Sequence, residues 1–196
     1  MAYNSRNIDP SAYLSIILRV RIYSSRYWKQ RCFGLDAETI LEKAKDLDHI
    51  GFGSGGMNRP SPFACLLAKL LQISPSIEIM QAYLDFSGGK PTNSVAEQQR
   101  DLRYMRALVA TYIRMVGTSR LVFRLLEPLL SDYRKVNILQ TDGRYERISM
   151  DEFLGSLLNC DSNLLLGIAL PVLTRRNIVE SRGDLGAYRS PLDDGE

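Results

Sequence analysis

Three glycines in this sequence, Gly51, Gly53 and Gly56, have the spacing of a dinucleotide-binding loop. Such a loop holds a pyrophosphate only where it joins a strand to the N-terminus of a helix within a βαβ unit. Here the apolar pattern predicts a helix before the glycines, and Asn58-Arg59-Pro60 intervenes before the next helix. We therefore expect a loop between two helices and no bound cofactor.

His49 is the single histidine, so a Ser-His-Asp or Cys-His arrangement would depend on it. It falls at the end of a predicted helix, where a surface histidine near the helix C-terminus is the simpler interpretation. Carboxylate pairs such as Asp46 and Asp48 are too close in sequence to face each other on a helix. The sequence thus predicts no catalytic site.

Cys32, Cys65 and Cys160 lack the close spacing of a zinc half-site or a redox pair. With one histidine they make no convincing zinc set, so no metal is expected. Unpaired cysteines favour a reducing compartment. The first residues carry no apolar signal region, and the longest apolar run, 164–173, is too short to span a bilayer.

Basic and aromatic residues form a more informative pattern. No acidic residue occurs between Arg19 and Arg31, and the basic residues there alternate with Tyr23, Tyr27 and Trp28. A second set, on a predicted helix over 98–116, falls within about 120° opposite the apolar face at roughly 100° per residue. It consists of Arg100, Arg103, Arg106 and Arg114. Both faces could bind acidic peptides or phosphates. A solvated helix face, and for Trp28 a place in the core, explain the pattern equally well.

Helices are predicted to position these residues. Capping residues before prolines, such as Ser61-Pro62 and Ser74-Pro75, mark helix starts, and Ser149 with Glu152 has the spacing of a capping box. The predicted helices lie near 10–23, 25–32, 37–49, 62–73, 75–85, 98–116, 119–131, 150–159 and 163–180. Apolar residues occupy nearly all of 62–73, so we expect this helix to be the central, most buried one.

One hairpin is predicted near 136–148, because two strand-like runs flank Asp142-Gly143. The fold class is therefore all-α, a compact multi-helix domain with one small β-hairpin. We expect a single helical domain over 1–181 and a flexible C-terminal tail over 182–196. The segment 87–97 has loop composition and is predicted to be mobile.

Five blocks of the sequence resemble the pre-mRNA-splicing factor 38 family and follow the family order. They are RVRIYSSRYWKQRCFGL (19–35), GGMNRPSPFACLLAKLLQI (55–73), RYMRALVATYIRMVGT (103–118), LEPLLSDYRKV (126–136) and MDEF (150–153). The resemblance implies a non-catalytic nuclear scaffold, associated with the tri-snRNP and required for spliceosome activation. It also implies two protein partners, a zinc-finger protein and a microfibrillar-associated-protein-like protein. The Arg/Ser-rich tail of animal members has no counterpart in this sequence, so its contacts are not carried over.

Ten residues are predicted from charge and expected exposure to bind partner proteins, through short segments docked between helices. They are Arg21, Tyr27, Trp28, Lys29, Asn58, Arg59, Arg103, Arg106, Tyr133 and Arg134. The alternative is an RNA-binding protein that acts through its arginine-rich helix faces. A pI near 8.8 and the lack of an RNA-module signature make RNA a weak contact at most, and neither a membrane nor a small-molecule substrate is expected.

Overall fold

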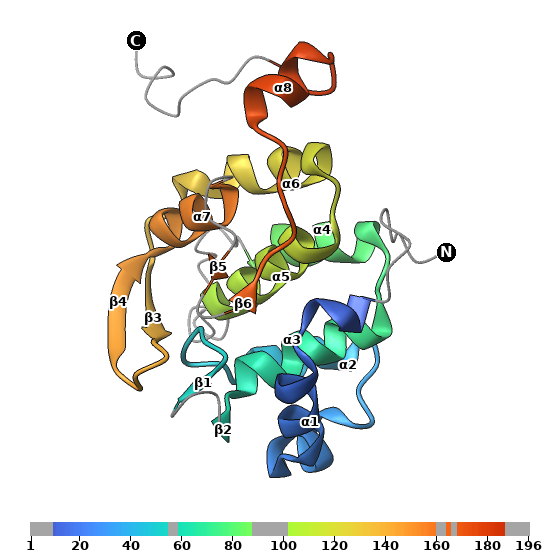
Figure 1. Ribbon diagram of the computed structural model, residues 1–196, viewed down its shortest axis with the longest axis vertical. Coiled ribbons are helices and arrows are strands. Elements are labelled where there is room, and N and C mark those ends of the chain that lie inside the picture. Colours follow the sequence, from blue (N-terminus) through green and yellow to red (C-terminus); the bar gives the residue numbers. More distant parts are fainter. Residues whose placement is uncertain (1–9, 55–58, 88–101, 160–163, 166–167, 187–196) are drawn as a thin grey trace, which may run out of the picture.

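Helices dominate the computed structural model, which describes residues 10–54, 59–87, 102–159, 164–165 and 168–186 (Figure 1). The helices are η1 (Pro10–Tyr13), α1 (Ile16–Ser24), η2 (Trp28–Cys32), α2 (Thr39–Ala44), α3 (Pro62–Ile73), α4 (Ile77–Ser87), α5 (Arg103–Val116), α6 (Ser119–Leu126), η3 (Glu127–Ser131), α7 (Met150–Leu158) and α8 (Arg176–Ser181). The strands are β1 (Gly53–Ser54), β2 (Arg59–Pro60), β3 (Lys135–Leu139), β4 (Tyr145–Ser149), β5 (Leu164–Leu165) and β6 (Ile168–Ala169). The predicted mostly helical domain with a small hairpin is confirmed.

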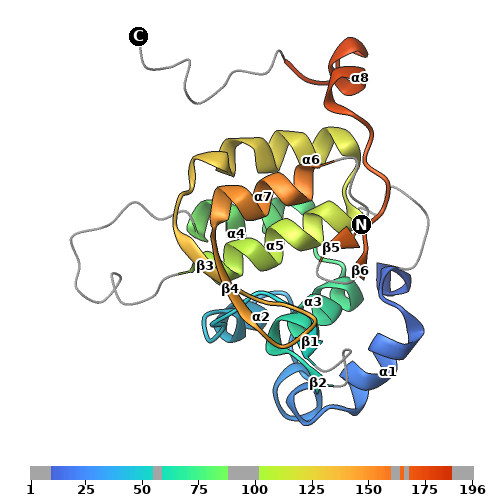
Figure 2. The same ribbon diagram turned by 60° about the vertical axis from the view of Figure 1, so that its left-hand side comes forward.

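The helix α5 lies at the centre of the molecule (Figure 2). It contacts α2, α3, α4, α6 and α7. Every residue from Met105 to Val116 is buried, whereas α3 is buried at nine of its twelve residues. The prediction that 62–73 is the most buried helix was therefore wrong. Polar side chains on α5 suggested a solvent face, but three of them are enclosed by neighbouring elements.

Local capping explains where several helices begin. The hydroxyl of Ser61 accepts a hydrogen bond from Ala64 N at 3.0 Å, and Ser149 forms the predicted capping box with Glu152. Ser74 was expected to start the next helix. Instead it ends α3 in a left-handed conformation with φ of 49°.

Ser61 joins the start of α3 to the preceding loop, because its hydroxyl also donates to Gly51 O. We expect Ser61→Ala to lower the free energy of unfolding by about 2 kcal/mol, since it removes an N-cap and leaves a buried carbonyl without its donor. Urea unfolding followed by circular dichroism measures this loss. The matched change Ser131→Ala, on an exposed hydroxyl, should stay within about 0.5 kcal/mol. Equal effects for the two variants would contradict the role assigned to Ser61.

The hairpin forms where it was predicted. β3 and β4 pair antiparallel from Lys135 opposite Ser149 to Leu139 opposite Tyr145. The inward side chains of Val136 and Ile138 enter the core. Ile50, the residue expected just beyond the 37–49 helix, forms a parallel bridge with Ile138, so α2 ends earlier than predicted. The extended backbone that this bridge requires is incompatible with a longer helix.

The predicted helix over 163–180 was wrong. β5 and β6 pair antiparallel, and an extended strap over 170–175 follows. Among the described residues of this range, the helical ones are those of α8, which begins at Arg176. Pro171 disfavours a helix here, because proline lacks an N–H donor and restricts the residue before it. Leu170 and Leu173 of the strap are buried, whereas Val172 is exposed.

The predicted tail, 182–196, is described as far as residue 186. Arg176 anchors the first residues of this tail. Its guanidinium forms an ion pair with Glu127 at 2.7 Å and donates a hydrogen bond to Gly186 O at 2.9 Å. Asp184 adds an exposed ion pair with Arg120 at 3.3 Å. Residues 187–196, and residues 88–97 of the predicted mobile loop, lie outside the described residues.

Candidate protein-interaction surfaces

The glycine-rich segment packs closely against the backbone of other segments of the chain. Gly51 has φ of +152°, and a Cβ on it would lie 2.7 Å from Leu139 O. Gly53 has φ of +149°, and a Cβ there would lie 2.5 Å from Arg59 O. Only glycine allows such close backbone approaches. Both residues sit between α2 and α3 as expected, beside short strands, whereas Gly56 lies outside the described residues.

His49 is not the surface histidine that the sequence suggested. It is 9% exposed, its Nδ1 lies 2.5 Å from the carboxylate of Asp48, and its ring meets Tyr145 edge-on at 5.5 Å. The bridge between Ile50 and β3 carries this histidine against the hairpin. Among the described residues, an aspartate and a tyrosine thus contact its ring, and neither is the Ser or Cys partner that a triad would need.

The two described cysteines are poor nucleophiles. Burial raises the pKa of Cys32 to about 12, with Cys65 adding to the shift. Burial also raises the pKa of Cys65 to about 11, against a hydrogen bond with Ser25 that lowers it. Thiols with such pKa values stay protonated at neutral pH and are unreactive. Within the described ranges, His, Cys, Asp and Glu side chains form no cluster that could hold a metal ion.

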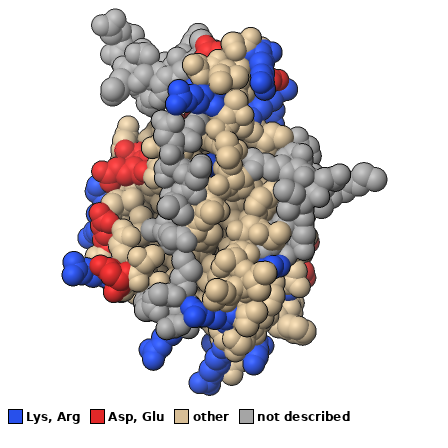
Figure 3. All heavy atoms as spheres, viewed as in Figure 1, with Lys and Arg blue, Asp and Glu red and all other residues tan. Residues whose placement is uncertain are grey.

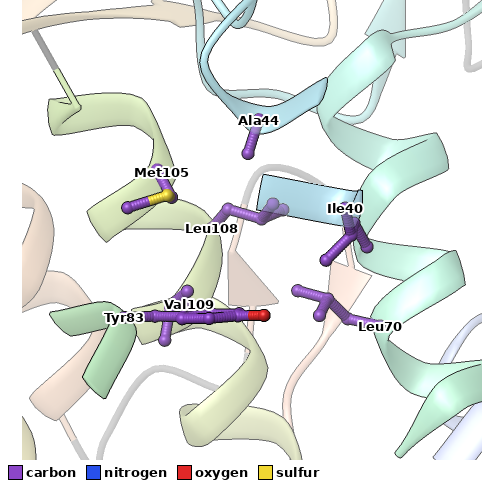
Figure 4. A pocket seen from close by; sticks show the side chains of 7 residues that line it. All are labelled: Ile40, Ala44, Leu70, Tyr83, Met105, Leu108 and Val109. Atoms are coloured by element: carbon purple, nitrogen blue, oxygen red, sulfur yellow. The ribbon is translucent and has the colours of Figure 1, made fainter. Parts of the chain in front are cut away.

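A small cavity between α2, α3, α4 and α5 has a volume of about 10 Å³ (Figure 4). Its lining is apolar, with Ile40, Leu70 and Leu108 among the contributing residues, and the Tyr83 hydroxyl donates to Ala37 O. This volume suits no more than one water molecule, and an apolar cavity of this kind stays dry. It is a packing defect of the core and offers no substrate site.

The basic-aromatic segment lies at the lower end of Figure 1, in α1 and η2. Trp28 is only 5% exposed, and its ring packs on Tyr23 at a centroid distance of 4.8 Å. The ammonium of buried Lys69 lies 5.8 Å from the Trp28 ring and donates to Phe33 O at 2.9 Å. Trp28 is therefore a core residue, which was the second interpretation of its place in the sequence. Lys29 remains exposed.

Two further predicted residues of this segment are half-buried. Burial, with the nearby Cys32 and Cys65, raises the pKa of Tyr27 to about 12, so its phenol remains protonated. Arg21 lies in the last turn of α1, where a cation favourably meets the helix C-terminus. Both side chains keep part of their surface in solvent.

The expected solvent-facing arginines of the 98–116 helix are largely enclosed. Arg106 is 8% exposed and Arg114 is 0% exposed, whereas Arg103 is half-buried and donates to Lys135 O. Arg100 lies outside the described residues. The prediction of a solvated arginine face is wrong at Arg106 and Arg114, because α4, α7, the segment between η3 and β3 and the strap supply acceptors for their guanidinium groups.

An enclosed charge cluster forms around Asp132. Its carboxylate pairs with Arg106 at 2.7 Å and with Arg134 at 2.6 Å. Ser87 extends the cluster, because its hydroxyl accepts from Arg106 and its carbonyl accepts from Arg134, both at 3.3 Å. The cluster ties α4 and α5 to the segment between η3 and β3. Arg106 and Arg134 thus have a structural role, and their predicted partner contacts stay untested.

The charged groups in this cluster shift one another's pKa values. Burial by itself would raise the pKa of Asp132. The hydrogen bonds and charge of Arg134, together with the charge of Arg106, outweigh this effect, and the pKa of Asp132 is lowered. Burial lowers the pKa of Arg106, and the charge of Asp132 opposes that shift. An arginine keeps its proton at neutral pH in either case. The cluster is therefore an ionised one.

Arg114 binds two carbonyl oxygens from distant parts of the chain. Its Nε donates to Leu157 O in the last turn of α7 at 2.7 Å, and its Nη1 donates to Pro171 O in the strap at 2.8 Å. Both acceptors belong to segments that no sequence pattern connects with α5. The guanidinium therefore joins three elements inside the domain.

The remaining predicted residues are more accessible. Arg59 and Tyr133 are exposed, and Asn58 lies outside the described residues. Because Trp28 and Arg106 are buried, the ten predicted residues do not form one exposed surface. Sequence reasoning also missed exposed apolar side chains, notably Ile16, Ile17 and Val20 of α1. Their helical spacing opposite Leu18 and Ile22 was the signal that could have found them.

Almost the whole chain is similar to known proteins. The model of the PRP38 family matches residues 4–183. Pre-mRNA-splicing factor 38 of Arabidopsis thaliana is 39% identical over 99% of this chain and 50% of its own length. Pre-mRNA-splicing factor 38A of Xenopus laevis is 36% identical over 98% of this chain and 57% of its own length. The chain thus spans about half the length of the curated relatives it matches.

The fold also matches a solved structure, the Snu23-Prp38-MFAP1(217-258) complex of Chaetomium thermophilum. The matched chain is 34% identical with a TM-score of 0.83, and the match covers 98% of this chain and 91% of that chain. No helix in the described part of our chain is long and apolar enough to cross a bilayer. The family model, the relatives and the shared fold agree, and the chain belongs to the PRP38 family.

Proposed function

We propose that this chain is a non-catalytic scaffold that binds other proteins of the spliceosome during pre-mRNA splicing. The observation that carries the proposal is the match, over 98% of this chain, to a family member solved in complex with two other proteins. Relatives that bear the name of a splicing factor support the same process. The buried thiols, the small dry cavity and the structural roles of Arg106 and Arg114 are consistent with a protein that binds partners and performs no chemistry.

The finer expectations follow from the same family. We propose that the partners are a zinc-finger protein corresponding to Snu23 and a segment corresponding to MFAP1(217-258). We also propose that the chain resides in the nucleus, associates with the tri-snRNP and is needed for spliceosome activation. The exposed residues Lys29, Arg59 and Tyr133 are the predicted contacts most accessible to such partners.

Affinity purification of the tagged full chain from nuclear extract tests this function. We expect the counterparts of Snu23 and MFAP1 to co-purify together with tri-snRNP proteins. The double variant Lys29→Glu/Arg59→Glu should recover at least about tenfold less of one partner if charged contacts hold it. Arg144→Glu, on an equally exposed arginine of the hairpin, is the matched control. Recovery of no spliceosomal protein by the unmodified chain would contradict the scaffold function.

Direct RNA binding is the second candidate, and the structure weakens its main support. Arg106 and Arg114 already hold a carboxylate and two carbonyls inside the domain. Phosphate contacts would make affinity fall steeply as salt rises. A salt titration with spliceosomal RNA therefore separates the two functions, since a scaffold predicts weak and sequence-independent binding at physiological salt.

A further inference from the structure

The short helical segment that follows α1 presents cations and one aromatic ring to solvent. Five residues in and beside η2 share this exposure. They are Arg26, Lys29, Gln30, Arg31 and Phe33, and we call them the η2 patch. The side chain of Phe33 is 75% exposed. A single exposed phenylalanine is ordinary on a protein surface, but a ring among cations matches the sites that bind single-stranded nucleic acid.

The backbone of η2 gathers these side chains on the outer side of one turn. It is a π-helical turn, in which Phe33 N donates to Trp28 O at 3.0 Å, five residues back. Side chains four or five positions apart therefore lie one turn apart. Arg26 Nε donates to Gln30 Oε1 at 3.1 Å across this turn, and Arg31 follows one position later. Such π-turns are rare and occur frequently at functional sites.

The inner side of the same turn is packed into the core. Trp28 and Cys32, four positions apart, are 5% and 0% exposed. Buried Lys69 of α3 donates to Phe33 O at 2.9 Å, so the backbone of Phe33 is held while its ring stays in solvent. A Cβ built on Gly34 would meet no other described segment within 4 Å, so the space beside the ring is open. The patch is preformed, and a ligand would lose little free energy to ordering it.

The positive charge of the patch is not neutralised by neighbouring residues of the described chain. The sequence from Pro10 to Leu35 contains no acidic residue. Within the described ranges no carboxylate forms an ion pair with the three cations of the patch. Asp46, whose charge acts on the phenol of Tyr27, pairs with none of them. Figure 3 shows Lys and Arg, without Asp or Glu, on the lower end of the molecule, where η2 lies.

We propose that the η2 patch binds single-stranded RNA without regard to sequence. The three cations contact phosphates, and a base stacks on the exposed ring of Phe33. Lys29, four positions before Phe33, lies one turn from it and places a phosphate contact next to the stacked base. This site differs from the arginines of α5, because Arg106 and Arg114 are enclosed whereas the patch is exposed. The inference adds to the scaffold function and does not depend on it.

Other ligands match the patch less well. Duplex RNA keeps its bases stacked on one another, so the ring of Phe33 would find no base. An acidic peptide would neutralise the cations, but aspartate and glutamate offer no flat face to the ring. An anionic membrane needs a larger apolar surface or a second anchor for stable binding, and the patch has one apolar side chain. A single strand supplies a negative charge with each nucleotide and a π-face with each base.

Fluorescence anisotropy of a labelled uridine dodecamer with the purified full chain tests the proposal. Each neutralised phosphate of a single strand contributes about 0.7 to the salt dependence, so three contacts predict that log K falls with log salt at a slope of about −2. We expect a dissociation constant of roughly 1 to 100 μM at physiological salt, the range of sequence-independent binding. A dodecamer of mixed sequence should bind with similar affinity, because every base can stack on the ring.

Two variants separate the charge contacts from the stacking contact. Arg26→Gln/Arg31→Gln should weaken binding about tenfold or more and reduce the slope to about −0.7, since one cation is left. That cation, Lys29, is also a predicted protein contact and is kept so that the two functions are measured apart. Phe33→Ala should weaken binding about 5-fold to 100-fold without changing the slope, because stacking releases no counterions.

Matched controls carry the same changes on other elements. Arg124→Gln/Arg144→Gln removes two exposed arginines from α6 and the hairpin, and Phe86→Ala removes a ring of α4 that is 59% exposed. Salt screens charges that lie outside the patch, so neither control should change the affinity by more than about twofold. Thermal melts confirm that each variant is folded.

Several outcomes would overturn the proposal. Equal losses in the patch pair and the control pair would mean that RNA binds all over the surface. A slope that stays near −2 in Arg26→Gln/Arg31→Gln, or unchanged binding in Phe33→Ala, would also contradict it. So would duplex RNA, an oligoglutamate of equal charge or phosphatidylserine vesicles that bound as tightly as the uridine dodecamer. Because these measurements use purified chain and ligand, their failure would leave the recovery of spliceosomal proteins, and with it the scaffold function, untouched.

Discussion

Replacing Asp132 with alanine is expected to lower the free energy of unfolding by about 3–5 kcal/mol, because the change leaves the enclosed charge of Arg106 without its counterion. Arg106 and Asp132 have side chains that are 9% and 7% exposed, so water cannot take over the role of the carboxylate. Arg134 is more exposed and can turn to solvent. A domain whose total stability is about 5–15 kcal/mol would lose a large part of it. Chemical denaturation of purified protein measures the change.

Two further variants check the cause. Asp132→Ala/Arg106→Met removes the stranded charge as well, and we expect it to recover part of the lost stability. Asp142→Ala breaks an exposed pair with Arg144 and should change stability by no more than about 0.5 kcal/mol. If Asp132→Ala resembled Asp142→Ala, the charge cluster would have no structural importance.

The stabilisation from Asp132 should depend on pH in a defined direction. The folded protein holds the Asp132 pKa below its usual 3.8, so the carboxylate is a stronger acid in the folded state than in the unfolded state. Its contribution is therefore complete above about pH 5 and is lost as the pH falls through the lowered pKa. The difference in unfolding free energy between the unmodified chain and Asp132→Ala should shrink only below about pH 4. A difference that grew on acidification would contradict the assignment.

Replacing Arg114 with methionine is expected to cost about 3 kcal/mol, because Leu157 O and Pro171 O would both lose a buried donor. Lysine at this position can serve one of the two carbonyls at a time, so Arg114→Lys should lose about half as much. The matched control is Arg124→Met, on an exposed arginine of α6, which should change stability little. Hydrogen exchange in the strap gives a second measurement, since protection near Leu173 should fall in Arg114→Met and not in the control.

The sequence predicted those parts of the fold that depend on local signals. Ser61 with Pro62 located the start of α3, and Asp142-Gly143 located the hairpin turn. The apolar spacing of 98–116 identified α5, whose described residues begin at Arg103. These features follow from hydrogen bonds and backbone preferences within a few residues, which is the range that a sequence pattern can show.

The errors concern contacts between distant segments. Arg106 and Arg114 looked like a solvent face because their acceptors, Asp132, Leu157 and Pro171, come from elsewhere in the chain. The strap over 170–175 looked helical because its apolar residues are dense, although Pro171 within it disfavours a helix. A guanidinium that is hydrogen-bonded inside a domain has the same sequence pattern as one in water.

Among the candidate contact residues, sequence reasoning ranked charge and aromaticity above exposed aliphatic side chains. Trp28 proved to be a core residue, whereas Ile16 and Val20 proved to be on the surface. Helix periodicity gives the two faces of α1 but does not say which face meets the core when both are apolar. Only the packing of α1 on α3 resolves that choice.

The guanidinium of Arg114 also bears on synthesis of the protein by the ribosome. One of its acceptors, Pro171 O, lies 57 residues further along the chain. The helices α5 and α7 can pack as soon as both have emerged from the ribosome. The buried guanidinium of Arg114 lacks Pro171 O until the strap has left the exit tunnel. We therefore expect nascent chains arrested just before Pro171 to stay protease-sensitive around α5, and chains arrested well beyond α8 to become resistant.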